Sequence, residues 1–225
     1  MYYPPMPRIA RIIAPNYPHH ITQRGNNCAT VFFDDEDRLT YLKLLTANAK
    51  KYHLQILAYC LMDTHIHLLA VPETEIALSR GIGLTNMMYT QYLNRKMHQS
   101  GRIWQNRFFS CVVDSDRHLW AVARYIECNP LKAGVADSAE SYRWSSAKAH
   151  LTGTKDPRLH TRSWLSPKNR PTYAEFFRAE DETIDTAIRK ATRTGRPCGS
   201  EKFIDKLELQ LQQPLRPRKP GRPRK

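Results

Sequence analysis

The sequence contains no apolar stretch near the roughly 20 residues that a membrane-spanning helix requires. Its opening residues, MYYPPMPRIARIIAP, also lack the uninterrupted apolar segment of a secretory signal peptide. These two absences predict a soluble, cytoplasmic protein with no membrane partner. The length of 225 residues is enough for one ordinary domain with its own core and an extension.

Paired cysteines are also absent. The cysteines are odd in number and widely spaced, and no C-x-x-C occurs; the five are Cys28, Cys60, Cys111, Cys128 and Cys198. This pattern supports neither a disulfide framework nor a zinc knuckle. The sequence lacks H-E-x-x-H as well, which argues against a hydrolytic zinc protease.

Acidic residues are few relative to basic ones. The chain has 21 Asp and Glu against 35 Lys and Arg, a formal net charge of +14. Such a balance favours a polyanionic partner, with nucleic acid ahead of an anionic membrane. The last twelve residues, PLRPRKPGRPRK, hold six basic residues and four prolines, which predicts a disordered basic tail over 214–225. Without it, 29 basic residues remain against 21 acidic ones, so the body of the chain stays basic at +8.

Strand and helix patterns alternate along the first part of the chain. Strand patterns occur within 17–33, at 54–62, at 64–71 and at 107–113, and helical patterns occur at 34–49, 75–99 and 114–129. Their order is that of the split β-α-β arrangement of a ferredoxin-like fold. We therefore predict an α+β fold, β-α-β-β-α-β, with an antiparallel sheet and helices on one of its faces. In the second helix, the predicted buried positions are Leu78, Ile82, Met88 and Tyr92.

The composition changes after about residue 150. Residues 1–150 are predicted to form the main domain, and the turn-rich, charged segment 151–171 a linker. Thr172 and Glu175 form a capping-box pair that predicts one helix ending at Gly195. A second helix is expected from Ser200, so that 172–213 would be a small helical appendage.

The segment DTHIHLLAV, residues 63–71, places two histidines in an apolar strand. Because side chains alternate along a strand, His65 and His67 lie on the same face and are close enough to share a ligand. Imidazoles among apolar neighbours need polar partners. The pattern indicates a metal site with open positions, as catalytic ions have. A pair of hydrogen-bonded core histidines is the alternative.

The segment ARYIECNP, residues 123–130, presents a tyrosine on an amphipathic helix. At 100° per residue, Tyr125 and Asn129 stand about 40° apart on the helix surface, at the rim of its apolar stripe. Such a tyrosine is half buried and half presented. A tyrosine that only extends its hydroxyl to water is the alternative.

Five ordered motifs together resemble one protein family. They are PHHITQRGNN, DTHIHLLAV, GRIWQNRFFS, RYIECNPLKAGV and the C-terminal GRPRK. The chain, from about residue 8, resembles the REP-associated tyrosine transposases, bacterial members of the single-tyrosine, His-hydrophobe-His (HUH) endonucleases. The resemblance implies that 1–150 is the catalytic domain.

Several site assignments follow from that resemblance. It implies that His65 and His67 are metal ligands, that Tyr125 is the nucleophile and that Asn129 is the third ligand. The implied cofactor is Mg²⁺ or Mn²⁺, with Mn²⁺ a serious competitor because imidazole is a less typical ligand for Mg²⁺. The implied reaction is cleavage and strand transfer of single-stranded, hairpin-forming REP DNA through a 5′-phosphotyrosine. A nucleoid-associated monomer is favoured, with a dimer as the alternative.

Further residues are candidates for DNA contacts. Arg24 and Arg107 are plausible phosphate contacts or ordinary surface charges. Further candidates for DNA contacts are Arg196, Arg218, Arg222 and Arg224. The second Gly-Arg-Pro copy, in GRPRK, resembles a hook whose arginines enter a narrow minor groove, and a solvated tail is the alternative. One of His19 and His20 could contact phosphate or backbone, and neither is assigned as a metal ligand. Trp104 is expected to pack in the core rather than stack on a base.

The sequence is also compatible with two other functions. A basic ferredoxin-like sheet could bind nucleic acid without cutting it, although such modules carry aromatic residues on the central strands. A metal-dependent nuclease could use the two histidines without the tyrosine. It would release a free 5′-phosphate and form no protein adduct.

Overall fold

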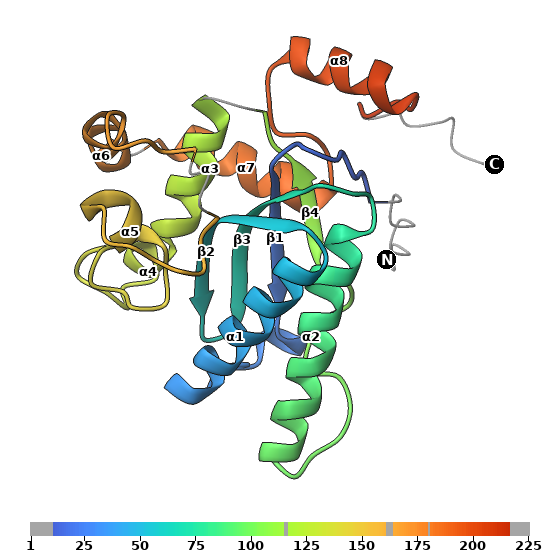
Figure 1. The fold of residues 1–225 in the computed structure, drawn as a ribbon, viewed down its shortest axis with the longest axis vertical. Helices are drawn as coiled ribbons and strands as arrows, with labels where there is room; N and C mark the ends of the chain where they lie inside the picture. Colours follow the sequence, from blue (N-terminus) through green and yellow to red (C-terminus); the bar gives the residue numbers. More distant parts are fainter. Residues whose placement is uncertain (1–10, 115–116, 161–163, 180, 217–225) are drawn as a thin grey trace, which may run out of the picture.

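The computed structural model describes residues 11–114, 117–160, 164–179 and 181–216. Within them, four strands form one antiparallel sheet in the order β2-β3-β1-β4 (Figure 1). The elements of this part are β1 (His19–Arg24), α1 (Asp35–Lys51), β2 (Leu54–Met62), β3 (His65–Pro72), α2 (Ala77–Lys96) and β4 (Phe109–Val112). The predicted α+β class and the predicted order of elements are confirmed.

The helix α1 shows how the sequence sets local structure. The Asp34 carboxylate accepts a hydrogen bond from the Asp37 amide at 3.0 Å and so caps the first turn. Acidic residues fill that turn and Lys50 and Lys51 end the helix, which complements the helix dipole. The buried side of α1 packs on α2 and β2.

One face of the sheet is apolar throughout. Ile66, Leu68 and Ala70 of β3 are fully buried against α1 and α2, in a core that includes Tyr41 and Tyr89. Ile21 of β1 joins this core from the neighbouring strand. Alternating side chains therefore direct this half of each strand toward the first two helices.

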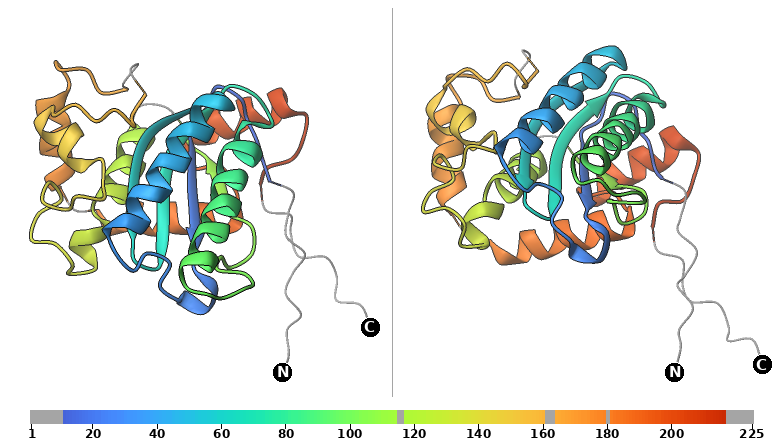
Figure 2. Two further views of the ribbon diagram at one scale, coloured as in Figure 1. Left: turned by 60° about the horizontal axis from the view of Figure 1, so that its bottom comes forward. Right: turned by 90° about the horizontal axis from the view of Figure 1, so that it is seen from below.

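The other face is covered as well, so the prediction of helices on one face is wrong. Helices α3 (Arg117–Glu127) and α7 (Glu182–Thr194) lie across it, opposite α1 and α2 (Figure 2). The physical reason is that the strands are apolar on both sides. Leu69 and Cys111 are fully buried on the α3 and α7 side.

The predicted single helix over 172–194 is two helices, α6 (Arg170–Arg178) and α7. The Asp181 carboxylate accepts from the Ile184 amide at 3.1 Å and starts α7 anew, whereas the predicted Thr172 and Glu175 pair does not cap α6. Gly195, at φ 70°, ends α7 as predicted. The remaining α-helices are α4 (Asn129–Lys132), α5 (Ala147–Thr152) and α8 (Glu201–Leu211). Helix α8 starts at Ser200 as predicted, and the Ser200 hydroxyl caps it by accepting from the Phe203 amide.

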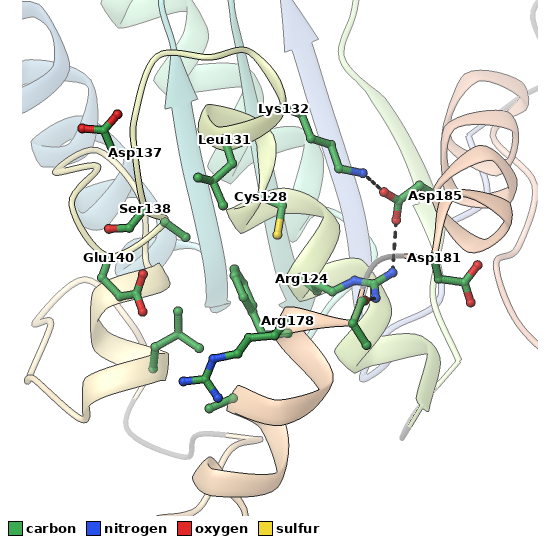
Figure 3. Close-up of a pocket in the computed structure, with 15 residues that line it drawn as sticks. Arg124, Cys128, Leu131, Lys132, Asp137, Ser138, Glu140, Arg178, Asp181 and Asp185 are labelled. Atoms are coloured by element: carbon green, nitrogen blue, oxygen red, sulfur yellow. Dashed lines mark hydrogen bonds and ion pairs between the residues drawn. The ribbon is translucent and has the colours of Figure 1, made fainter.

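Ion pairs fix α7 beside α3 and α4. The buried Asp185 of α7 lies 3.4 Å from the Arg124 guanidinium of α3 and also pairs with Lys132 of α4 (Figure 3). These residues line a pocket of about 370 Å³ between the helices. Helix α7 also contacts β4 and β1 of the sheet.

The proposed division at 150 and the linker over 151–171 stay predictions about domains. Part of the predicted tail is packed, however: Leu215 is buried with Phe203 and Leu207, and Arg216 pairs with three carboxylates. Its remainder, 217–225, and the candidate cap Ser115 lie outside the described residues. No helix in the described ranges is long and apolar enough to cross a membrane.

Candidate active site

The two histidines of β3 open into a pocket of about 510 Å³ on the α3 and α7 side of the sheet. In the antiparallel pairing of β1 and β3, Thr22 lies opposite His67 and Arg24 opposite His65, which brings these side chains to one end of both strands. The pocket is lined by His20, Thr22, Arg24, Thr64, His65, His67, Gln105, Phe109, Tyr125, Arg189, Thr192 and Arg193. Three arginines and no carboxylate are among them.

His65 and His67 are oriented as a pair. Their ring centroids are 5.1 Å apart, and the Nδ1 atoms lie 3.0 Å from Thr64 Oγ1 and from His20 Nε2, respectively. In the described part of the chain, neither Nε2 atom has a hydrogen bond. Burial lowers the pKa of both rings, strongly for His67, so both are neutral at pH 7. Neutral imidazoles with an available nitrogen are what a metal ion requires.

Tyr125 of α3 reaches the same pocket. Its ring lies edge-on to His67 and to His20, with centroids 5.6 Å and 5.7 Å away. Burial raises the pKa of the phenol, and the charge of Arg189 opposes that rise. The structure thus places a protonated phenol against His67 and His20, although Tyr125 lies 58 positions after His67 in the sequence.

Asn129 is placed differently. It is the first residue of α4, and its amide nitrogen donates to the carbonyl oxygens of Tyr125 at 2.7 Å and Ile126 at 3.2 Å. It does not line the pocket. The described residues contain no group of three His, Cys, Asp or Glu that could hold a metal. The assignment of Asn129 as third ligand therefore stays a prediction.

The candidate DNA contacts are spread over the molecule. Arg24 lines the pocket with the histidines, whereas Arg107 lines a separate hollow of about 610 Å³. The Arg196 guanidinium donates to the Leu215 carbonyl oxygen at 2.6 Å. Arg218, Arg222 and Arg224 lie outside the described residues. Trp104 packs in the core, as expected, and donates to the Asn86 carbonyl oxygen at 3.2 Å.

His20 and α7 contribute to the site in ways that the sequence did not predict. His19 contacts backbone, as expected, but His20 bonds to two side chains, Thr192 and His67. Alternation along β1 could have found His20, because residues 20, 22 and 24 share a face. The sequence carries no signal for Thr192, Arg189 or Arg193, because only the packing of α7 brings them to the pocket.

A sequence model of IS200-like transposases matches residues 14–129, just over half of the chain. The chain belongs to this family. The matched segment of the IS200-like transposase contains His20, His65, His67, Tyr125 and Asn129. Thr192 and the arginines of α7 lie beyond it.

Two known proteins are similar to the transposase. The Haemophilus influenzae protein named "Putative REP-associated tyrosine transposase" is 27% identical over 148 residues, which cover 58% of this chain and 84% of that protein. A solved REP-associated tyrosine transposase bound to a REP hairpin matches with a TM-score of 0.58 and 15% identity, over 72% of this chain and 94% of that one. The latter shows the shared fold. The resemblance indicated by the five motifs is confirmed.

Proposed function

We propose that this transposase is a metal-dependent single-strand DNA endonuclease and strand transferase that acts through a 5′-phosphotyrosine. The observation that carries the proposal is the contact of the Tyr125 ring with His67, 5.6 Å between centroids, inside a pocket that also holds His65. A nucleophile and a ligand pair from separate segments meet there. All three residues come from one chain, which favours a monomer that acts alone.

The two histidines would hold a divalent ion through their Nε2 atoms. Such an ion, when bound, offsets the negative charge that a phosphodiester gains on attack. Mn²⁺ suits imidazole better than Mg²⁺ does, and both remain candidates. Asn129 would complete the ligand set, in keeping with the family resemblance.

Tyr125 would supply the nucleophile. Its oxygen forms a bond to the phosphorus while the bond from phosphorus to the 3′ oxygen breaks, leaving a 5′-phosphotyrosine and a 3′-hydroxyl. The phenol loses one proton and the leaving oxygen gains one, so charge balances. A 3′-hydroxyl can later attack the phosphotyrosine and release Tyr125, which gives strand transfer without an external energy source.

The lining of the pocket supports a phosphodiester substrate. Arg24, Arg189 and Arg193 face the pocket from β1 and α7, without a carboxylate among the lining residues. A cationic, acid-free lining attracts phosphate. The bound REP hairpin of the related structure makes hairpin-forming repeats the substrates to test first.

The decisive experiment incubates the protein with labelled single-stranded hairpin DNA and Mn²⁺ or Mg²⁺, followed by a denaturing gel. We expect a labelled protein band that disappears in Tyr125→Phe and in His67→Ala. The matched control is Tyr142→Phe, another half-buried tyrosine, whose hydroxyl donates to the Leu61 carbonyl oxygen outside the pocket. This variant should form the adduct.

Other outcomes would identify the other functions. Cleavage that persists in Tyr125→Phe without an adduct would contradict the proposal and indicate a metal-dependent nuclease. Binding without any cleavage, in the presence of either ion, would indicate a nucleic-acid-binding module.

A further inference from the structure

A chain of hydrogen bonds links helix α7 to His67. Thr192 Oγ1 lies 2.9 Å from the Ile188 carbonyl oxygen and 2.7 Å from His20 Nδ1. His20 Nε2 in turn lies 3.0 Å from His67 Nδ1. His20, His67 and Thr192 are all buried, so water does not compete for these bonds.

The first member of the chain fixes its direction. A carbonyl oxygen only accepts, so the single hydroxyl proton of Thr192 goes to the Ile188 oxygen. Thr192 Oγ1 is then an acceptor and takes the proton of His20 Nδ1. The Cys111 thiol, 3.4 Å away, can donate to the remaining lone pair of the same oxygen.

The same direction continues to His67. A neutral His20 with a proton on Nδ1 has a bare Nε2, which accepts from His67 Nδ1. His67 then carries its proton on Nδ1 and keeps the Nε2 lone pair for the pocket. The near-parallel rings of His20 and His67, at 15° and 5.2 Å between centroids, hold this contact in one orientation.

We propose that Thr192 and His20 are positioning residues that fix the His67 tautomer, so that Nε2 is the atom offered to a divalent ion. The outer nitrogen of a metal-bound histidine is commonly held by such a partner. The role of His67 as a ligand rests on the proposed function. The tautomer itself does not.

Helix α7 thereby takes part in the active site. Asp185, two turns before Thr192, pairs with Arg124 of α3, the residue that precedes Tyr125 (Figure 3). The helix that orients the histidine ligand is thus tied to the helix that carries the phenol. The C-terminal region is required for a preorganised site even though the family match ends at residue 129.

The test measures the tautomer of His67 directly by ¹⁵N NMR of metal-free protein labelled with ¹⁵N-histidine, at pH 7.5. The His67 signals are assigned as those that are missing from the spectrum of His67→Gln. We expect the wild-type ring to be protonated at Nδ1 and bare at Nε2. In Thr192→Val, which keeps the shape but loses the hydroxyl, His20 is free to change tautomer. His67 should then become a mixture, and Mn²⁺ affinity measured by electron paramagnetic resonance should fall about tenfold.

Two variants provide the controls. Thr192→Ser keeps the hydroxyl and should retain both the tautomer and the Mn²⁺ affinity. Thr194→Val removes an exposed hydroxyl of the same helix that bonds to the Lys190 carbonyl oxygen, and should also match the wild type. Circular dichroism and thermal melting establish that each variant is folded.

A wild-type His67 protonated at Nε2 would overturn the inference without any variant, even if Thr192→Val fails to fold. A folded Thr192→Val with unchanged tautomer and unchanged Mn²⁺ affinity would overturn it as well. A failure of the proposed function would give another result. The protein would then form no adduct with DNA, while His67 would still be protonated at Nδ1.

Discussion

The two faces of the sheet use the same strands for different purposes. Ile66 and Leu68 of β3 point into an apolar core under α1 and α2, while His65 and His67, which alternate with them, point to a polar pocket under α3 and α7. The first face is built from segments that follow one another in the sequence. The second needs α3, and finally α7, which begins 110 residues after β3 ends.

The difference between the two faces shows which parts of the fold depend only on the local sequence pattern. Apolar packing is non-directional, so alternation and helical spacing are enough to build the first face. A polar site in a buried setting depends on specific partners for each nitrogen and oxygen. The second face is therefore sensitive to single groups far away in the chain.

Neighbouring residues on opposite faces offer the sharpest test of this contrast. We expect His65→Ala to lower the rate of cleavage at least about a thousandfold, because removing a metal ligand forfeits several kcal/mol of charge stabilisation. The unfolding free energy should change by less than about 1 kcal/mol, since His65 is only partly buried and Nδ1 bonds only to the adjacent Thr64. Denaturant unfolding and single-turnover cleavage measure the two effects.

Ile66→Ala is the reciprocal variant. Its side chain is fully buried, so we expect a loss of about 2–5 kcal/mol in unfolding free energy. Cleavage per folded molecule should stay near that of the wild type. Equal losses of activity in both variants would show that the two faces are not separable.

Asn129 tests whether the ligand set is complete. Its amide nitrogen is engaged by the α3 carbonyl oxygens, and the family resemblance assigns the residue to the metal. We expect Asn129→Ala to weaken Mn²⁺ binding about tenfold and Asn129→Gln, with its longer reach, to keep most of the affinity. If Asn129→Ala binds Mn²⁺ as tightly as the wild type in a Mn²⁺ titration, Asn129 is not a metal ligand.

The first face was largely predictable from the sequence, with an instructive exception in α2. Leu78 and Ile82 are buried as predicted, but Met88 is 40% exposed, and Tyr89 and Leu93 are buried instead. After Ile82, the buried positions of α2 therefore lie one residue later in the sequence than predicted. Tyr89 fits the core because its hydroxyl donates to the Val31 carbonyl oxygen at 2.6 Å, a partner that spacing does not reveal.

On the second face, the sequence singled out residues that the structure brings together, but not the side chains that support them. The strand pattern placed His65 and His67 on one side of β3, and the helical pattern placed Tyr125 at the rim of an apolar stripe. Thr192 occupies a buried position one turn after Ile188 and looks like an ordinary part of an apolar stripe. Its bond to His20 depends on tertiary packing over 172 residues, which local patterns do not encode.

The arginines of α7 extend the comparison to DNA binding. Arg193 lines the pocket, whereas the exposed Lys190 of the same helix does not. We expect Arg193→Gln to weaken binding of single-stranded DNA and to flatten the dependence of log affinity on log salt by about 0.7. Lys190→Gln, which removes the same charge, should leave the slope unchanged. Equal effects of the two variants would indicate a general charge effect and no specific contact in the pocket.

The smallest expected effect concerns the buried His19 on the apolar side of β1. Its Nδ1 lies 2.8 Å from the Tyr17 carbonyl oxygen, and its Nε2 accepts from the Ala14 amide at 3.3 Å. Burial lowers the pKa of His19 from 6.5 to about 4. As the pH falls below 6.5, the unfolded chain binds a proton that the folded protein does not take up until about pH 4, so stability falls within that window.

His19→Gln should make this decline shallower by about 1.4 kcal/mol per pH unit, because glutamine does not titrate. Urea unfolding at pH 7, 6 and 5, without divalent ions, measures the slope, and His98→Gln controls for the loss of an exposed histidine. If the unfolding free energy of His19→Gln falls with pH as steeply as that of the wild type, the acid sensitivity comes from the face of the sheet that carries His20. Burial lowers the pKa of His20 to about 3. The pH dependence of stability would then belong to the face of the active site and not to the apolar core.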